Sequence, residues 1–494
     1  MSVATRGPAL ARTVPIPLRR PTPSRATAVV VTAPLALAMA LGLWGIRRQN
    51  TLWGDEAVTY QLAHRDLAQI WLTARHVDLV HAVYYALMHE IFALAGGGLL
   101  TLRLPSVLAT CLAASGVGLV GLRLAGPRVG LLAGLVFPLL PQVQKYAQEG
   151  RSYAMVCALV TWATYALVTG VRQRTRWRWA VYGCTMLLAC LLHEFAVLAL
   201  AAHGVTLVVS RVPRPVFAAW SVAAAGVVAG LLPLAILSVG QSGQLSWMDG
   251  PVRPGYFLLA AVVGVACARA PLASRRPVRL SALAVPILVL PGLVLLIASL
   301  VKPLFVDRYV LYSDIGCALL LGALIDYCIR RPRFRRTAGI AAAAALAALV
   351  PLSLALRTPQ ARSNDATAIA AAVRDEGRPG DGLLYLSGQH RILTAASPAD
   401  TRHLTDLALA QDPVSSNTLA GVELPAQDIA ARMLEFDRIV AVRATGARSP
   451  AGPQEAAKTS TLRRYFRESA TSQVNGARVT VYVRDHDASA ETVP

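Results

Sequence analysis

The sequence TAVVVTAPLALAMALGLWGI at residues 27–46 decides the fold, and RRQNTLWGDEA follows it at residues 47–57. About 20 predominantly apolar residues in a helix span the hydrocarbon core of a bilayer, which is about 30 Å thick. Residues 1–26 carry five arginines and no acidic residue. The stretch has the charged front and apolar middle of a signal peptide, but it is long and no small-residue cleavage site follows it. We therefore expect an uncleaved membrane anchor behind a cytoplasmic basic tail.

The rest of residues 27–356 holds ten more apolar stretches that fit membrane helices. Val77–Leu94 is a further candidate, but Asp78 and Glu90 interrupt it, and each charge would cost about 2.5–3.5 kcal/mol in a lipid-facing helix. We therefore place Val77–Leu94 as a juxtamembrane or half-inserted helix in the first outer loop, residues 47–103. The ten further spans are expected near residues 104–122, 129–143, 152–170, 177–192, 194–210, 216–239, 255–268, 280–300, 310–329 and 337–356.

The distribution of charge tests this topology of eleven spans. The chain has 494 residues, 55% of them hydrophobic, and a formal net charge of +21. The cytoplasmic segments hold 22 basic residues and one acid, Asp326, whereas the outer loops hold ten of each. Positive charge gathers on the cytoplasmic side of membrane proteins, so the excess indicates orientation and not a nucleic-acid partner. We expect a multi-pass protein of the cell membrane with a cytoplasmic N-terminus.

The outer loops carry the side chains that suggest chemistry. Asp55 and Glu56 stand beside Trp53 at the bilayer edge, directly after the first span. A carboxylate can take the proton of an incoming hydroxyl group as general base, and arginines can stabilise a departing phosphate. Such a combination suits sugar transfer from a lipid phosphate whose tail stays in the bilayer. The other candidates for the site are His81, Tyr85, Arg103, Glu149, Arg151, Arg308 and Tyr309.

Each of these candidates has a structural alternative. Trp53 could be an interfacial anchor, Arg103 could extend to lipid headgroups, and His193 with Glu194 could form an interhelical hydrogen-bonding pair. Ionisable residues near membrane depth are nevertheless functional candidates by default. The seven cysteines contain no CxxC motif and lie in apolar segments, which is typical of core-filling residues.

Together these motifs resemble the GT-C membrane glycosyltransferases, closest to the family 39 type that includes protein O-mannosyltransferases and the lipid A aminoarabinose transferase. The resemblance covers about residues 27–356. It rests on Trp53-Gly54-Asp55-Glu56, His81…Tyr84-Tyr85, Arg103-Leu104-Pro105-Ser106, Tyr146…Glu149…Arg151…Tyr153 and Arg308-Tyr309.

The resemblance implies that Asp55 is the catalytic base, that the donor is a polyprenyl-phosphate-linked sugar on the outer face, and that transfer inverts configuration. The sequence departs from the family pattern in two places. Ala82-Val83 replaces the prolines after the first-loop histidine, and no second aspartate motif follows the third span. Glu149, together with Asp55, could ligate a divalent cation such as Mg²⁺ or Mn²⁺, or it could simply pair with Arg151, so metal dependence stays open.

Residues 357–494 have a different composition, with 16 basic and 16 acidic residues. Asn364 is expected to cap a helix over residues 366–376, and Leu383–Ser387 is expected to form a buried strand. Alternation of helices and apolar strands predicts a small extracytoplasmic α/β domain that binds the acceptor, contacts the cell wall or is a structural cap. The remaining predicted elements are helices near 426–435 and 454–469 and strands at 438–443 and 478–484.

These observations predict an α-helical polytopic membrane glycosyltransferase of GT-C type. It would move a sugar, mannose or a pentose, from a polyprenyl phosphate to a protein, lipid or cell-wall glycan acceptor. Asp55 would be the base, Glu56 a helper or metal ligand, and Arg151 and Arg308 the phosphate contacts. The alternative is a transporter or flippase of a lipid-linked sugar, although internal repeats and broken midplane helices, which are typical of transporters, are not evident. A non-catalytic cell-wall scaffold is a third hypothesis.

Overall fold

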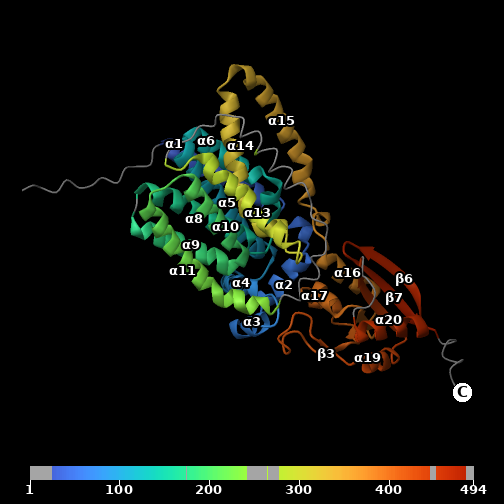
Figure 1. Cartoon of the computed structure of the whole chain (residues 1–494). Helices are drawn as coiled ribbons and strands as arrows, with labels where there is room; N and C mark the ends of the chain where they lie inside the picture. Colours follow the sequence, from blue (N-terminus) through green and yellow to red (C-terminus); the bar gives the residue numbers. More distant parts are fainter. Residues whose placement is uncertain (1–24, 174, 242–263, 265–276, 446–451, 486–494) are drawn as a thin grey trace, which may run out of the picture.

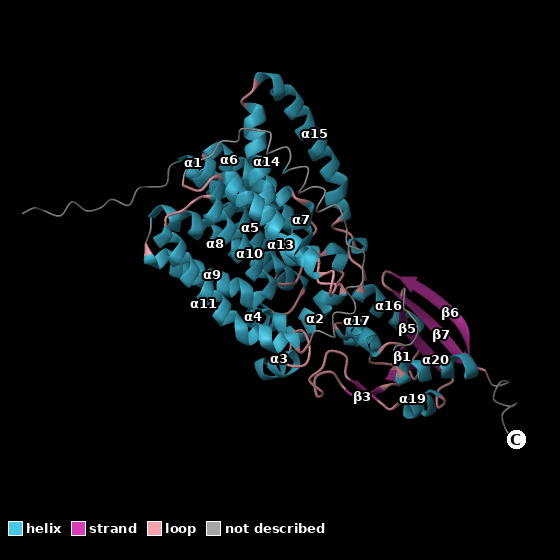
Figure 2. Ribbon diagram, in the orientation of Figure 1, coloured by secondary structure: helices cyan, strands magenta, loops and turns pink. Residues whose placement is uncertain are grey.

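The computed structural model describes residues 25–173, 175–241, 264, 277–445 and 452–485, and within them every element before residue 382 is a helix (Figures 1 and 2). These helices form a bundle, and a small sheet region lies at one end of it. The α-helices are α1 (Arg25–Leu43), α2 (Gly54–Ala63), α3 (Leu67–Ala74), α4 (Ala82–Ala95), α5 (Leu99–Ala125), α6 (Pro127–Val136), α7 (Pro141–Ala147), α8 (Tyr153–Gln173), α9 (Arg176–Leu192), α10 (Leu198–Val209), α11 (Arg214–Val239), α13 (Leu280–Ala298), α14 (Asp314–Ile329) and α15 (Pro332–Ala355). Short 3-10 helices are η1 (Arg48–Asn50), η2 (Leu79–His81), η3 (Phe137–Leu139), η4 (Glu194–Val197) and η6 (Asp307–Ser313).

The many-helix membrane fold predicted from the sequence is confirmed. Among the described residues, seven helices are long and apolar enough to cross a membrane, and each coincides with a predicted span. The spans predicted near 129–143, 177–192 and 194–210 are also helical, but their helices are shorter. The span predicted near 255–268 lies almost entirely outside the described residues.

The span predicted near 129–143 is broken into α6, η3 and α7, so the prediction of one continuous helix there is wrong. Pro138 falls within η3, and Leu140 adopts an extended conformation with φ −63° and ψ 131°. A residue that precedes proline avoids the helical region because the proline ring clashes with its backbone, and Pro141 follows Leu140. The break makes α7 a separate helix, and Glu149 and Arg151 follow it in the chain.

Close helix packing in the centre of the bundle depends on glycine. A Cβ on Gly130 of α6 would lie 2.6 Å from the carbonyl oxygen of Gly118 of α5. A Cβ on Gly322 of α14 would lie 2.6 Å from the backbone nitrogen of Ala133. Small residues let membrane helices approach until their backbones touch. The glycines thereby fix α5, α6 and α14 against one another.

The segment Val77–Leu94 forms η2 and α4, beside α2 and α3, in the loop that the sequence predicts to lie on the outer side. One face of α4 buries Tyr84, Tyr85 and Met88, whereas Leu87 and Leu94 are exposed. An outward apolar face on such a short helix agrees with the predicted juxtamembrane position, which stays a prediction.

The C-terminal region contains a five-stranded mixed sheet in the order β2-β1-β5-β7-β6. Strand β1 runs parallel to β2 and β5, and β7 runs antiparallel to β5 and β6. The strands are β1 (Gly382–Tyr385), β2 (Thr405–Asp406), β3 (Leu409–Gln411), β4 (Val422–Glu423), β5 (Arg438–Ala444), β6 (Phe466–Val474) and β7 (Ala477–Arg484). The helices are η7 (Pro359–Ala361), α16 (Ala366–Glu376), η8 (Gly388–His390), α17 (Arg391–Ala395), α18 (Pro398–Thr401), α19 (Ala426–Met433) and α20 (Pro453–Tyr465).

Helices cover both faces of this sheet, as Figure 1 shows. Leu383 and Val440 pack against Ile369 of α16 on one face. Leu384 and Ile439 face the opposite way, in a cluster that also holds Ile429 of α19 and Leu462 of α20. Burial on both faces explains why the central strands are continuous apolar runs. The small α/β region predicted from the sequence is confirmed, while its boundary at residue 357 stays a prediction.

Two details of the C-terminal prediction are wrong. The cap of α16 is Asp365, whose side chain accepts a hydrogen bond from the backbone nitrogen of Ala368 at 3.0 Å, and not Asn364. The helix predicted over 454–469 ends at Tyr465, and β6 begins at Phe466. Strand β6 forms there because it pairs with β7 along its length, and such tertiary pairing overrides local helix propensity.

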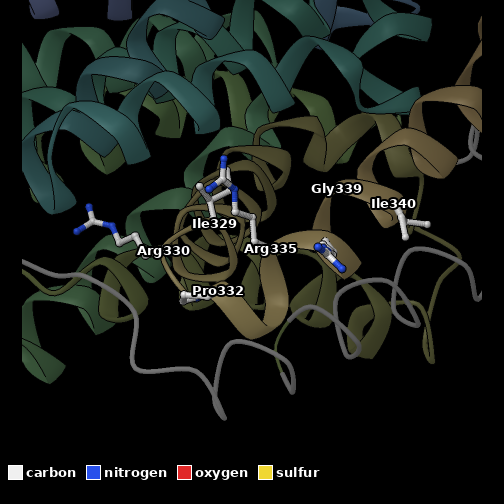
Figure 3. A pocket seen from close by; sticks show the side chains of 7 residues that line it. Ile329, Arg330, Pro332, Arg335, Gly339 and Ile340 are labelled. Carbon is white, nitrogen blue, oxygen red and sulfur yellow. The ribbon is translucent and has the colours of Figure 1, made fainter.

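A shallow pocket lies at the turn between α14 and α15 (Figure 3). Its lining includes Arg330, Arg335 and Arg336 and no acidic residue. It contains none of the predicted site residues, and the predicted topology puts this turn on the cytoplasmic side. The functional site is therefore expected at the opposite ends of these helices, on the predicted outer side.

Candidate active site

Asp55 lies in the first turn of α2, two residues after Trp53, whose backbone is extended. The partial positive charge of a helix N-terminus favours a carboxylate at this position. Its Oδ2 atom lies 3.3 Å from Nη2 of Arg308. The same oxygen is buried and accepts no hydrogen bond from the described residues. Asp55 is thus a carboxylate held beside a cation, with one buried oxygen that accepts no hydrogen bond from the described part of the chain and a side chain that is 28% exposed.

Glu56, the next residue, is buried and surrounded by donors. Arg103 donates to both of its carboxylate oxygens, from Nε at 2.7 Å and from Nη2 at 2.6 Å. Arg48 lies 3.5 Å away, and the backbone nitrogen of Gly150 donates at 3.1 Å. Although burial opposes ionisation, Arg103 and Arg48 lower the pKa of Glu56 to about 2. The structure therefore pairs Glu56 with Arg103. This geometry suits a structural role for both residues better than the predicted ones, which are helper or metal ligand for Glu56 and phosphate contact for Arg103.

A second cluster gathers around Asp78, whose backbone is left-handed with φ 59°. Its Oδ1 pairs with Nδ1 of His81 at 2.8 Å, and its Oδ2 accepts a hydrogen bond from the hydroxyl of Tyr85. Arg151 lies 3.3 Å from the same Oδ2 and donates to the Tyr85 hydroxyl at 2.7 Å. Although burial opposes ionisation, His81 and Arg151 lower the pKa of Asp78 below its usual range. The cluster joins three predicted site residues through one aspartate.

His81 presents its second ring nitrogen to this region. With Nδ1 directed at Asp78, Nε2 is buried and has no hydrogen-bond partner among the described residues. Burial and the neighbouring Arg151 lower the pKa of His81. The ring therefore has one buried nitrogen that no described residue satisfies.

Aromatic rings connect the two clusters. The His193 ring lies 5.5 Å from the His81 ring and 4.5 Å from the Tyr309 ring, between centroids. The Arg308 guanidinium lies 5.6 Å from the Tyr153 centroid and 5.7 Å from the Trp53 centroid. Cation–π contacts of this kind hold an arginine in place while its charge stays available. Residues from α2, η2, α8, η4 and η6 thus form one aromatic and cationic site.

Glu149 lies beside a cation that the sequence does not suggest. Its Oε2 atom is 3.3 Å from Nε of Arg362, in the C-terminal region, and both side chains are buried. Burial raises the pKa of Glu149 above its usual value. Asp55 and Glu149 each have an arginine where a metal ion would supply charge. The described residues contain no group of three or more His, Cys, Asp or Glu side chains that could hold a metal ion, and a divalent cation at Asp55 and Glu149 stays a prediction.

The structure unites most of the predicted candidates and adds others. It joins Asp55, Arg308 and Tyr309 in one cluster and His81, Tyr85 and Arg151 in the next. Further residues of the site, which the predicted set of site residues omits, are Trp53, Asp78, Tyr153 and His193. Asp78 could have been found from its spacing, three residues before His81 and seven before Tyr85. Nothing in the sequence near Glu149 points to Arg362, which is over 200 residues away.

The structure has a GT-C type fold, and the fold class predicted from the sequence is confirmed. No protein-family model and no curated protein sequence matches the chain. The structure is similar to that of ArnT from Cupriavidus metallidurans bound to undecaprenyl phosphate, with a TM-score of 0.57, 13% identity, and coverage of 91% of this chain and 97% of that one. The apo structure of ArnT gives a TM-score of 0.57, 14% identity and coverage of 93% and 98%. Archaeal oligosaccharyltransferase AglB from Archaeoglobus fulgidus, in complex with an inhibitory peptide and a dolichol-phosphate, gives 0.47, 12% identity and coverage of 95% and 75%.

Proposed function

We propose that this protein is an integral membrane glycosyltransferase that moves a sugar from a polyprenyl-phosphate donor to an extracytoplasmic acceptor. The observation that carries the proposal is the pairing of Asp55 with Arg308, in which a buried carboxylate oxygen without a hydrogen bond lies 3.3 Å from a guanidinium nitrogen. The GT-C type fold supports it, because the similar ArnT structure is described as bound to undecaprenyl phosphate.

The proposed reaction assigns one role to each charge. Asp55 takes the proton of the acceptor hydroxyl as general base, and the acceptor oxygen forms a bond to the anomeric carbon. The bond from that carbon to the phosphate oxygen breaks, and its electron pair leaves with the phosphate. Attack on the face opposite the departing phosphate inverts the configuration.

Arg308 and Arg151 are the proposed phosphate contacts. A guanidinium group suits a phosphate because its donors match the oxygen geometry. Arg308 is held among the rings of Trp53, Tyr153 and Tyr309. Preorganised cations stabilise developing negative charge without reorganisation during the reaction. Mannose or a pentose is the proposed sugar, and a protein, a lipid or a wall glycan is the proposed acceptor.

The test is Asp55→Asn in membranes supplied with a radiolabelled polyprenyl-phosphate sugar. We expect transfer to be abolished while expression and thermal stability are retained, because asparagine keeps the shape but cannot take the proton. Glu90→Gln is the matched control, since it neutralises an exposed carboxylate on α4 of the same loop. Wild-type transfer by Asp55→Asn contradicts the role of Asp55. Unchanged lipid-linked sugar recovered on the other side of sealed vesicles, with no labelled product, would favour a transporter instead.

A further inference from the structure

The start of α2 is bonded by a segment of the C-terminal region more than 300 residues away in sequence. Trp53 is the N-cap residue of α2, and its side chain makes no capping hydrogen bond. Asn364 supplies the missing acceptor, because its Oδ1 accepts a hydrogen bond from the backbone nitrogen of Gly54 at 2.7 Å. The first backbone N–H groups of a helix lack partners within the helix, so Asn364 caps α2 from outside.

The same segment also forms hydrogen bonds with both backbone polar groups of Leu52, the residue before Trp53. The backbone nitrogen of Leu52 donates to Oγ1 of Thr367 at 2.9 Å. The carbonyl oxygen of Leu52 accepts from the backbone nitrogen of Ala366 at 2.8 Å. Three backbone groups in the three residues before Asp55 are therefore bonded to residues 364–367. This segment fixes where α2 starts and hence the direction of the Asp55 side chain.

Residues 362–367 are themselves anchored on two sides. On one side, Arg362 pairs with Glu149 at 3.3 Å and donates to the carbonyl oxygen of Lys145 at 2.9 Å. On the other side, the backbone nitrogen of Asp365 donates to the carbonyl oxygen of Asn475, between β6 and β7, at 2.9 Å. The segment is a rigid connection from the sheet to the loop that carries the proposed base.

We infer that Asn364 and Thr367 are positioning residues for Asp55, so that the C-terminal region completes the active site and is not an accessory to it. This inference rests on the proposed function, because it assigns the alignment of the proposed base to another part of the chain. The two side chains act through the backbone of Leu52 and Gly54 and do not touch the substrate.

The first test compares Asn364→Ala and Asn364→Asp in the full-length protein with a polyprenyl-phosphate sugar. We expect Asn364→Ala to lower kcat by about 10- to 100-fold, since small misplacements of a catalytic group have effects of this size. The KM for the donor should change little. Asn364→Asp should recover most of the lost turnover, because its carboxylate still accepts the hydrogen bond from Gly54 and suits a helix N-terminus.

Thr367→Val is the second test, and Thr471→Val is its matched control. Both changes remove a hydroxyl that takes part in one hydrogen bond, but the bond of Thr471 joins β6 to Thr480 of β7. Thr367→Val should lower kcat, and Thr471→Val should not. Equal effects of the two changes, or wild-type kcat in Asn364→Ala, would overturn the inference. If Asn364→Ala lowers kcat while Asp55→Asn stays active, the proposed base is wrong and Asn364 aligns another group, which also overturns the inference.

A second readout does not depend on activity. Hydrogen–deuterium exchange of a peptide over residues 52–57 should be faster in Asn364→Ala than in the wild type, and unchanged in Thr471→Val. Unchanged exchange in Asn364→Ala would overturn the inference even if no sugar donor were accepted. Faster exchange in a protein that transfers no sugar would support the contact and contradict the proposed function.

Discussion

Asp55 and Glu56 are adjacent carboxylates with different surroundings. Asp55 keeps an oxygen without a hydrogen bond beside Arg308. Glu56 points into the bundle, where Arg103 and Gly150 occupy its oxygens. Successive residues of a helix point in different directions, so one residue of difference separates the site from the core. We therefore assign the proposed chemistry at this loop to Asp55 and a stabilising role to Glu56.

The first prediction concerns the stability that Glu56 supplies. Glu56→Gln should lower the free energy of unfolding by about 3–5 kcal/mol, because it leaves the buried charges of Arg103 and Arg48 without compensation. The measurement is thermal unfolding of the purified protein in detergent. Asp375→Asn is the control, since that carboxylate is 66% exposed and pairs with an exposed arginine. A midpoint equal to that of the control would contradict the structural role.

The second prediction is the pH dependence of the same interaction. The pKa of Glu56 is lowered from 4.5 to about 2 in the folded protein. Between these values the unfolded chain binds a proton that the folded chain does not bind, so stability falls as pH falls. The stabilisation is fully present above about 4.5 and is lost toward 2. The difference in unfolding midpoint between wild type and Glu56→Gln should therefore shrink as pH decreases through this window, and a constant difference would contradict it.

The third prediction concerns the charge of Arg308. Arg308→Met should lower transfer by about 10²- to 10³-fold, which is the effect of removing one preorganised donor from a developing anion. Arg308→Lys should recover only part of the activity, because lysine lacks the planar fork of donors. Initial rates with saturating donor measure both changes. Arg75→Met, at an exposed position after α3, is the control, and a normal rate in Arg308→Met would exclude Arg308 from the site.

At the scale of elements, the hairpin of β6 and β7 contacts the segment that caps α2. Gly476 connects these strands with φ +91°, and a Cβ there would overlap the Cβ of Asn364. The segment that caps α2 is thus fitted against the turn between β6 and β7. The glycine is required twice, for its backbone conformation and for its lack of a side chain.

The fourth prediction separates these two requirements. Gly476→Ala should destabilise the protein and also lower transfer, because the added methyl group displaces Asn364. Gly380→Ala is a matched control, since Gly380 has φ +92° and no atom within 4 Å of its added Cβ. That control carries only the backbone strain, of about 1–2 kcal/mol, and should keep normal transfer. Thermal unfolding and initial rates of both variants measure the two effects, and equal rates would contradict the coupling.

At the scale of the whole molecule, the charge of the chain and the location of the site agree. In the predicted topology, the 22 basic residues of the cytoplasmic segments lie on the opposite side of the membrane from Asp55, Arg151 and Arg308. Helix α15 leads from the arginine-rich turn of Figure 3 to the C-terminal region (Figure 1). The predicted orientation therefore puts the site and the sheet on the same outer side.

The fifth prediction tests this orientation. In a variant whose seven cysteines are replaced, Asp375→Cys should react with a membrane-impermeant maleimide in intact cells. Arg333→Cys, at an exposed position of α15, should react only after permeabilisation. The two positions serve as controls for each other, and the reverse pattern would invert the topology.

The sequence by itself determined the membrane helices, the α/β nature of the C-terminal region and most of the site candidates. These features follow from hydropathy, strand patterning and residue type, which are local properties that a window of sequence contains. The sequence also identified Asp55 as a candidate, since two carboxylates beside a tryptophan at the end of a span are unusual. The predicted continuous helix over 129–143 failed because two prolines interrupt it, although that signal is also local.

Only the tertiary structure decided which charged groups pair. Glu56 pairs with Arg103, Glu149 pairs with Arg362, and Asp78 pairs with both His81 and Arg151. The same packing lets Asn364 accept a hydrogen bond from Gly54. The partners in these contacts lie between 3 and 310 residues apart, and of these pairs only Glu56 and Arg103 join two helices. An ion pair depends on distance in space, which packing sets and sequence spacing does not. Residue type therefore predicted which side chains are candidates for chemistry, and packing decided which of them have their oxygens occupied by protein donors.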